Sequence, residues 1–483
     1  MARLFISATH KSSGKTTVSI GLAGALAARG LSVQTFKKGP DYIDPMWLAR
    51  ASGRPCFNLD FNTQRETEIL STFRSRSRGS DIALVEGNLG LHDGVDIAGA
   101  DSSAALARLL RTPVVLVVDT MGISRGIAPL VLGHTAFDRS IDIAGVILNK
   151  VGGARQETKI RQALERYADV PVLGAIGRDN ALAVTERHLG LTTPAEDCDY
   201  DSKLAHMREV VARNVDLDRV IEIAAAAGSP AGPAVVDTPA AHDVRIAVAR
   251  DAAFGFYYTD DFEALERAGA ELVFIDLLHD VKLPPVDALY IGGGFPETQA
   301  AKLAANHSMR AQMRDAILDG LPTYAECGGL MYLTRSISFR GEVHEMVGVV
   351  PADTVVGDRP EGRGLVVLDE TADAPWPFRP ERASIPAHEF HYGALRNIDP
   401  ACRFAYRMKR GYGVDGDHDG IVVHNLLASF SHLRDTSRHR WARRFVAFVR
   451  KAHSGARKPG AERGKLPPSG ANAAYDCDFG EYR

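Results

Sequence analysis

The sequence predicts an α/β protein divided into two domains. Short apolar, β-branched runs alternate with longer amphipathic stretches, which is the pattern of a parallel sheet with helices on both faces. The 483 residues exceed what one hydrophobic core usually organises. Residues 225–243 are small, proline-rich and without periodicity, which is typical of a linker. We therefore expect one domain over residues 1–224 and another over residues 244–451.

The expected strands can be placed along the chain. In the first domain they are the apolar runs at residues 4–8, 82–85, 114–118, 144–148 and 172–176. In the second domain they lie at residues 244–249, 272–275, 288–291, around Tyr324 and at 421–423, and an amphipathic helix follows at residues 441–451. Residues 452–483 are rich in Gly, Pro, Lys and Arg and predict a flexible basic tail.

The composition excludes several classes of protein. A hydrophobic content of 45% and a net charge of −3 are ordinary for a globular protein and give no reason to expect a nucleic-acid partner. Five cysteines without a Cys-x-x-Cys pair do not make a disulfide framework or a zinc site, and they fit a reducing compartment. Because we find no signal-peptide core and no apolar run of about 18 residues, we expect a cytoplasmic protein without a membrane partner.

The loop after the first strand predicts a nucleotide phosphate site. Residues 9–16 resemble a P-loop, with Thr9 where the first glycine usually stands. Small residues let backbone N–H groups converge on phosphate, Lys15 reaches the β and γ oxygens, and the Thr16 hydroxyl is a ligand for Mg²⁺. Asn149, after a later strand, is a candidate contact for the base, with a simple turn as the alternative. The candidate ATP-binding residues are Ser12, Ser13, Gly14, Lys15, Thr16, Thr17 and Asn149.

Two acids are expected beside the metal with Thr16. Asp41 lies in the turn-rich stretch at residues 38–45, where a surface turn is the alternative interpretation. Glu86 ends an apolar strand at the sheet edge where the nucleotide should lie. Asp93 and Asp119 are competitors for the same role.

A second site is predicted at Cys327. A β-prone segment ends at this cysteine, two glycines follow, and an apolar run then begins a helix. This is the pattern of a nucleophile elbow, in which small neighbours allow the sharp turn and the helix N-terminus favours thiolate over thiol. A buried structural cysteine is the alternative.

Glutamine hydrolysis would need a histidine and oxyanion donors beside that cysteine. We expect His432 to be the base, with His424 or His388 as competitors. No third, orienting acid is evident, because Leu433 and Arg434 follow His432. The expected oxyanion hole consists of backbone N–H groups of Gly293, Gly294 and Gly328, although a triple glycine can also be a flexible turn.

Together these motifs resemble one family. The stretches at residues 39–45, 187–191, 291–297, 325–333 and 388–392 closely resemble the cobyrinic acid a,c-diamide synthases, and the resemblance covers about residues 3–450. It implies a dethiobiotin-synthetase-like ATP domain followed by a class I glutamine amidotransferase domain of flavodoxin-like fold. It also implies a carbon–nitrogen ligase that uses ATP, Mg²⁺ and glutamine to amidate acetate side chains of a corrin ring, through an acyl phosphate.

By the same resemblance, Cys327 is the glutaminase nucleophile and His432 raises its nucleophilicity. Lys15 and Thr16 carry ATP and Mg²⁺, with Asp41 and Glu86 as metal-side acids. The family's glutaminase domain is known for an incomplete triad, in agreement with the missing acid.

Two departures leave the acceptor open. Residues 9–13 are more basic than the corrin enzymes' loop, and the cationic tail lies outside the family pattern. Related enzymes amidate sirohaem or nickel-sirohydrochlorin, so siroamide formation is the alternative reaction. An alternative of another class is a P-loop assembly or metal-delivery ATPase without glutaminase activity. The expected partners are small molecules, with a homodimer as the expected assembly. Expected contacts to the anionic rim of the ring are Lys37, Lys38, Arg54, Arg187 and His188.

Overall fold

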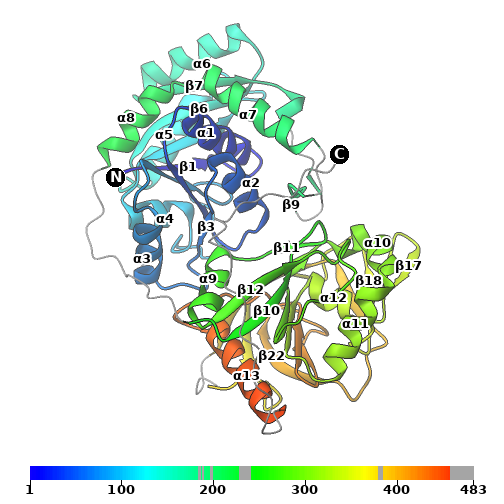
Figure 1. Cartoon of the computed structure of the whole chain (residues 1–483). Coiled ribbons are helices and arrows are strands. Elements are labelled where there is room, and N and C mark those ends of the chain that lie inside the picture. The colour runs from blue at the N-terminus through cyan, green and yellow to red at the C-terminus, as the bar shows by residue number, and fades with distance from the viewer. Residues whose placement is uncertain (183–185, 188–189, 196–198, 228–240, 379–383, 457–483) are drawn as a thin grey trace. The chain divides into compact units, whose positions relative to one another are not determined.

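A computed structural model describes residues 1–182, 186–187, 190–195, 199–227, 241–378 and 384–456 (Figure 1). The elements fall into two compact units, and each is described by itself. Among the described residues, no helix is both long and apolar enough to cross a membrane.

The first unit is built on a seven-stranded, fully parallel sheet in the order β3-β2-β4-β1-β5-β6-β7. Its strands are β1 (Ala2–Ala8), β2 (Val33–Lys38), β3 (Phe57–Leu59), β4 (Ile82–Glu86), β5 (Val114–Asp119), β6 (Ile143–Val151) and β7 (Val172–Gly177). Its helices are α1 (Lys15–Ala28), α2 (Ile43–Ser52), α3 (Glu66–Arg76), α4 (Ser103–Leu110), α5 (Ile127–Phe137), α6 (Ala154–Tyr167), α7 (Tyr200–Asn214) and α8 (Leu217–Ala226). Short pieces are the 3-10 turn Asn180–Leu182 and the pair β8 (Glu186–Arg187) and β9 (Gly190–Leu191).

Helices cover both faces of this sheet. One face carries Phe5, Phe36 and Leu116 and packs against apolar side chains of α3 to α6, such as Phe73 and Leu106. The other face lies under α1, α7 and α8. Because both faces are buried, the strands are continuous apolar runs, as the sequence predicted.

The second unit has a nine-stranded mixed sheet in the order β12-β10-β13-β15-β24-β23-β22-β19-β20. The first five strands are parallel and the last four antiparallel. In chain order the nine strands are β10 (Val244–Ala249), β12 (Ala270–Ile275), β13 (Ala288–Ile291), β15 (Thr323–Glu326), β19 (Gly362–Glu370), β20 (Ile385–His391), β22 (Arg403–Arg410), β23 (His418–Val423) and β24 (Leu426–Ser429).

Smaller elements complete the second unit. Four strands form a separate sheet in the order β17 (Glu342–Glu345), β16 (Ser336–Phe339), β18 (Asp353–Val356) and β21 (Gly393–Arg396), and β11 (Phe254–Phe256) pairs with β14 (Gly293–Gly294). The helices are α9 (Thr259–Arg267), α10 (Ala300–Ala305), α11 (His307–Leu318), α12 (Gly328–Leu333) and α13 (Trp441–Ala456), with a 3-10 turn at Pro296–Gln299.

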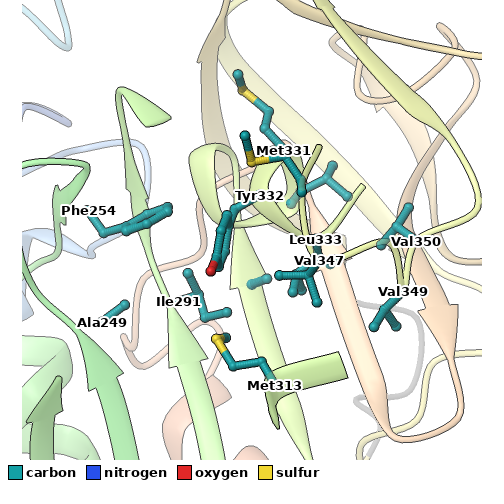
Figure 2. Close-up of a cluster of buried hydrophobic side chains, with 14 of the residues drawn as sticks. Ala249, Phe254, Ile291, Met313, Met331, Tyr332, Leu333, Val347, Val349 and Val350 are labelled. Atoms are coloured by element: carbon teal, nitrogen blue, oxygen red, sulfur yellow. The ribbon is translucent and has the colours of Figure 1, made fainter. Parts of the chain in front are cut away.

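The period of two along each strand divides the core of this unit. Ala247 and Leu289 face a cluster that includes α11 and α12, whereas Val248 and Tyr290 face a cluster with α9 and α13. Figure 2 shows the first cluster around α12, where the rings of Phe254 and Tyr332 lie 5.5 Å apart between centroids. The helix that follows the predicted elbow is therefore fixed by packing on its apolar side chains.

The expected element boundaries need two adjustments. Helix α8 continues to Ala226, and α13 continues to Ala456, so the regular structure extends past the expected ends at residues 224 and 451. Most of the expected linker (residues 228–240) and most of the expected tail (residues 457–483) lie outside the described residues.

Candidate functional site

The predicted phosphate loop lies between β1 and α1. Ser12 and Gly14 both have positive φ angles, 64° and 86°. Asn149 donates from its side-chain amide to the carbonyl of Ser13 (2.9 Å), and a Cβ on Gly14 would lie only 2.1 Å from that amide nitrogen. Glycine is therefore required at position 14 both by backbone conformation and by space. Asn149 was expected to contact the base; in the structure its amide supports the loop.

Two of the predicted side chains, those of Lys15 and Thr16, contact the predicted Glu86. Lys15 Nζ donates to Glu86 Oε1 at 2.8 Å, and the Thr16 hydroxyl donates to the same oxygen at 2.7 Å. Helix α1 begins at Lys15 and β4 ends at Glu86, so the strand end and the helix start converge at the carboxyl edge of the sheet.

A second acid at this point is Asp44, which sequence reasoning missed. The Thr16 hydroxyl lies 3.2 Å from Asp44 Oδ2, and Lys37 Nζ donates to that oxygen at 2.5 Å. The predicted Asp41 instead caps α2 by accepting the backbone N–H of Asp44, with its carboxylate 3.8 Å from Lys37 Nζ. The available signal was the spacing: Asp44 stands three residues after Asp41, in the first turn of α2.

The competing acids have other partners. Asp93 accepts the backbone N–H of Gly90 in the loop after β4, and Asp119 pairs with Lys150 at 2.8 Å. The structure does not bring either carboxylate to Thr16 by a hydrogen bond.

Buried charges set the protonation of this cluster. Burial alone would raise the pKa of Glu86, but the charges of Lys15 and Lys37 and the hydrogen bonds from Lys15 and Thr16 lower it to about 2. Burial and the neighbouring charge of Asp44 raise the pKa of Asp41 to about 7, against the opposing effect of Lys37. Burial disfavours the charge on Lys37, but Asp44, Glu86 and Asp41 together raise its pKa well above the usual range.

The oxygen atoms around Thr16 fit a magnesium ion. Magnesium is usually held by one or two carboxylates together with phosphate oxygens and water, and Thr16, Asp44 and Glu86 offer such oxygens. Glu86 Oε2 is buried and has no hydrogen-bond partner among the described residues, which leaves it available as a ligand. Within the described part of the chain, no group of three or more His, Cys, Asp or Glu side chains could hold a metal by itself.

The basic residues expected to contact the acceptor ring differ from one another in burial and in their partners. Lys37 is buried and paired within the acidic cluster, so it is not available to a bound ring unless those pairs break. Burial lowers the pKa of Lys38. Arg54 donates to the side chains of Gln34 and Ser32. The Arg187 side chain and His188 lie outside the described residues.

In the second unit, Cys327 forms a strained turn between β15 and α12. Its backbone has φ 46° and ψ −100°, a conformation that non-glycine residues rarely adopt. Its N–H donates to Ser429 O on the neighbouring strand at 2.7 Å. A Cβ on Gly328 would lie 2.9 Å from Gly294 N, so the glycines allow the close approach of the turn and β14. This is the geometry expected of a nucleophile elbow.

The thiol does not show the lowered pKa that the sequence predicted. Cys327 is 4% exposed, and burial raises the pKa of its thiol above the usual value. The charges of Glu297 and Glu326 act in the same direction, and the hydrogen bond from the Gly328 N–H opposes them. Desolvation therefore outweighs the short helix that follows.

His432 lies at the same sheet edge as Cys327. Residue 432 follows β24, whose last residue, Ser429, pairs with Glu326 at the end of β15. A Cβ on Gly293 would lie 2.5 Å from His432 Cε1 and 3.4 Å from its Nε2, which places the imidazole against β14, the strand that carries two of the predicted oxyanion donors.

The two competing histidines differ in position. His388 is beside His432 through a two-residue antiparallel bridge, and its ring stacks on that of His432. His424 precedes β24, at the end where Leu426 pairs with Thr323, so it lies at the opposite end of β15 from Cys327. Sequence reasoning also missed a carboxylate here: Glu326 Oε2 lies 3.4 Å from His432 Nδ1.

Comparisons with known proteins agree with the two-unit organisation. Residues 4–191 match the CobQ/CobB/MinD/ParA nucleotide binding domain, and residues 245–439 match the CobB/CobQ-like glutamine amidotransferase domain. A cobyrinate a,c-diamide synthase of Magnetococcus marinus is 44% identical over 462 residues, which cover 94% of this chain and 98% of that protein. The chain belongs to the cobyrinate a,c-diamide synthase family.

Archaeal relatives extend the comparison. Cobyrinate a,c-diamide synthases of Methanosarcina acetivorans and Archaeoglobus fulgidus are 41% and 40% identical, over 89% and 92% of this chain and 92% and 96% of those proteins. The resemblance drawn from the motifs is thereby confirmed, as is the α/β fold with a nucleotide-binding domain before a glutamine amidotransferase domain. Membership also gives the enzyme class, an amide-forming ligase.

Proposed function

We propose that the chain uses ATP, Mg²⁺ and glutamine to amidate the a- and c-acetate carboxylates of a cobyrinic acid-type tetrapyrrole, a step of cobalamin biosynthesis. The strongest support is that this family member has the residues for both half-reactions close together within each unit. Lys15 and Thr16 contact Glu86 in one unit, and the Cys327 turn lies at the same sheet edge as His432 in the other. An ATPase without glutaminase activity would have no use for the second arrangement.

The N-terminal unit is proposed to activate the acetate. A substrate carboxylate oxygen attacks the γ-phosphorus of ATP, ADP leaves, and an acyl phosphate forms. Lys15 offsets charge on the transferring group, and backbone N–H groups of residues 12–17 hold the phosphates. Thr16, Glu86 and Asp44 would hold Mg²⁺, which neutralises phosphate charge when bound. We give Asp41 an indirect role, because its carboxylate caps the helix that carries Asp44.

The C-terminal unit is proposed to release ammonia. The sulfur of Cys327 attacks the side-chain amide carbon of glutamine, while His432 takes the thiol proton and returns it to the departing ammonia. Backbone N–H groups of Gly293, Gly294 and Gly328 would stabilise the tetrahedral oxyanion. Water then hydrolyses the thioester to glutamate, and the ammonia attacks the acyl phosphate to give the amide and phosphate.

We also infer that the chain works in the cytoplasm, the compartment that supplies ATP, glutamine and reduced thiols. Assembly as a homodimer stays a prediction for a solution measurement of mass.

The deciding experiment separates the two half-reactions. We expect Cys327→Ala to abolish glutamine-dependent amidation of cobyrinic or hydrogenobyrinic acid and to retain amidation with high ammonium, scored by mass. Full glutamine-dependent activity in Cys327→Ala would remove the nucleophile assignment.

A parallel assay of the wild-type protein addresses the acceptor. Diamidation of the corrin acid supports the proposal. Turnover of sirohaem alone would replace it with siroamide formation, and ATP hydrolysis without any amidation would favour the ATPase alternative.

A further inference from the structure

We propose that Glu326 is the carboxylate that orients His432 in the glutaminase site, a positioning role that rests on the proposed function. Glu326 Oε2 lies 3.4 Å from His432 Nδ1, and both side chains are almost completely buried. In the low-dielectric interior the electrostatic interaction between two such groups is stronger than it is between exposed groups.

Residue 434, two positions after His432, does not supply an acid to the imidazole. Two residues after His432, the Arg434 side chain is buried and pairs with Asp260 at 2.7 Å. The carboxylate beside the imidazole comes instead from β15, directly before the nucleophile. A search downstream of the histidine therefore misses it, whereas the sheet register brings it into place.

The carboxylate of Glu326 is itself held on several sides. Its Oε1 accepts the Tyr324 hydroxyl at 2.5 Å and the backbone N–H of Leu433 at 2.9 Å, and its Oε2 lies 3.5 Å from the Tyr290 hydroxyl. Tyr324 and Glu326 are two residues apart on one strand, so their side chains share a face. Burial and then the charge of Glu326 raise the pKa of both tyrosines, so both remain protonated donors.

This anchoring specifies the imidazole tautomer. With Oε1 occupied by two donors, Oε2 is the oxygen that lies toward Nδ1, 3.4 Å away, and it would accept a proton carried on Nδ1. The other ring edge, which carries Nε2, faces Gly293 on β14. Nε2 is then unprotonated and can act as the base. The other titratable ring packed against His432 is His388, whose own Nδ1 lies 3.4 Å from the Tyr258 hydroxyl.

The chemical consequence is that two consecutive residues at the end of β15 have different roles. Residue 326 would hold the base in its reactive tautomer and stabilise the imidazolium that forms, and residue 327 would be the nucleophile. Replacing the carboxylate with an amide would turn an N–H group toward Nδ1 and favour the wrong tautomer.

The test is Glu326→Gln in the full-length chain. We expect glutamine hydrolysis to fall by about 10²–10⁴-fold through kcat with little change in KM, while ammonium-dependent amidation stays within a few-fold of wild type.

The matched control is Glu389→Gln. Glu389 is also buried, accepts the N–H groups of Tyr412 and Gly413, and lies 3.8 Å from another histidine, His391. We expect its glutaminase rate to stay within a few-fold of wild type. An equal loss in both variants would mean that a buried carboxylate is needed only for folding and would overturn the positioning role.

Two further results separate the hypotheses. If Cys327→Ala is inactive with glutamine but Glu326→Gln is fully active, the positioning role is wrong and the proposed function stands. Should Glu326→Gln fail to fold, the ¹⁵N shifts of His432 in wild-type protein, assigned with His432→Gln, decide the question. A proton on Nδ1 supports the proposal, and a neutral ring protonated on Nε2 overturns it.

Discussion

The rings of His388 and His432 lie face to face, with centroids 4.8 Å apart and planes inclined by 14°. Two imidazolium ions could not share this arrangement without strong repulsion. Burial, and then the charges of His432 and Arg434, lower the pKa of His388 well below its usual range. We conclude that the imidazole of His388 is uncharged and packs against the ring of His432 at the edge of the site.

This pKa shift makes stability depend on pH. In the unfolded chain His388 takes up a proton as the pH falls below about 6.5, whereas in the folded chain it remains neutral to a much lower pH. The unfolded state therefore binds more protons in that window, so the free energy of unfolding decreases as the pH is lowered. The urea concentration at the midpoint of unfolding should decrease between pH 7.5 and pH 5.5, and we expect this decrease to be smaller in His388→Gln than in wild type. Equal losses in the two proteins would contradict this.

Lys15→Ala should remove amidation with either nitrogen source. Without the lysine charge the phosphoryl transfer loses its stabilisation, so no acyl phosphate is available to either glutamine-derived ammonia or added ammonium. Basal glutaminase activity should survive and is the internal control for folding. Ammonium-dependent product at the normal rate would be incompatible with the phosphate-site assignment.

Asp44→Asn and Asp41→Asn should differ in their need for magnesium. Asp44 contacts the Thr16 hydroxyl, so we expect its variant to need at least about tenfold more Mg²⁺ for half-maximal activity. Asp41 has its pKa raised to about 7 and serves as a helix cap, so an uncharged side chain there should change the requirement far less. A magnesium titration of both variants checks this, and the reverse order would return the direct role to Asp41.

The sequence carried the local parts of these sites and missed the parts that depend on register. The phosphate loop and the cysteine turn are each encoded within a few consecutive residues, so glycine and small-residue spacing was enough to find them. Asp44 and Glu326 were overlooked although both stand inside recognised motifs. Their partners come from other elements. Asp44 contacts Thr16 on α1 and Lys37 on β2, and the partners of Glu326, residues 432 and 433, follow β24 beside β15.

The thiol of Cys327 shows a different limit. A short helix after a cysteine suggested a lowered pKa, but the sequence did not reveal how completely the side chain would be buried in the core cluster that includes α12. Desolvation depends on the three-dimensional packing around a group, and in this site it outweighs the local dipole.

Gly293→Ala should damage the glutaminase site by steric contact alone. The added methyl group would lie 2.5 Å from His432 Cε1, closer than carbon atoms can approach, so the imidazole must shift. Because displacements of about 1 Å can cost about 10²-fold in rate, we expect glutamine hydrolysis to fall by about that factor while ammonium-dependent amidation persists.

The matched control is Gly133→Ala on the exposed side of α5, where nothing lies within 4 Å of the new methyl group. That variant should keep full activity and gain about 0.5–1 kcal/mol of stability from helix propensity, measured by urea unfolding. An unimpaired glutaminase in Gly293→Ala would show that His432 does not need its position against β14.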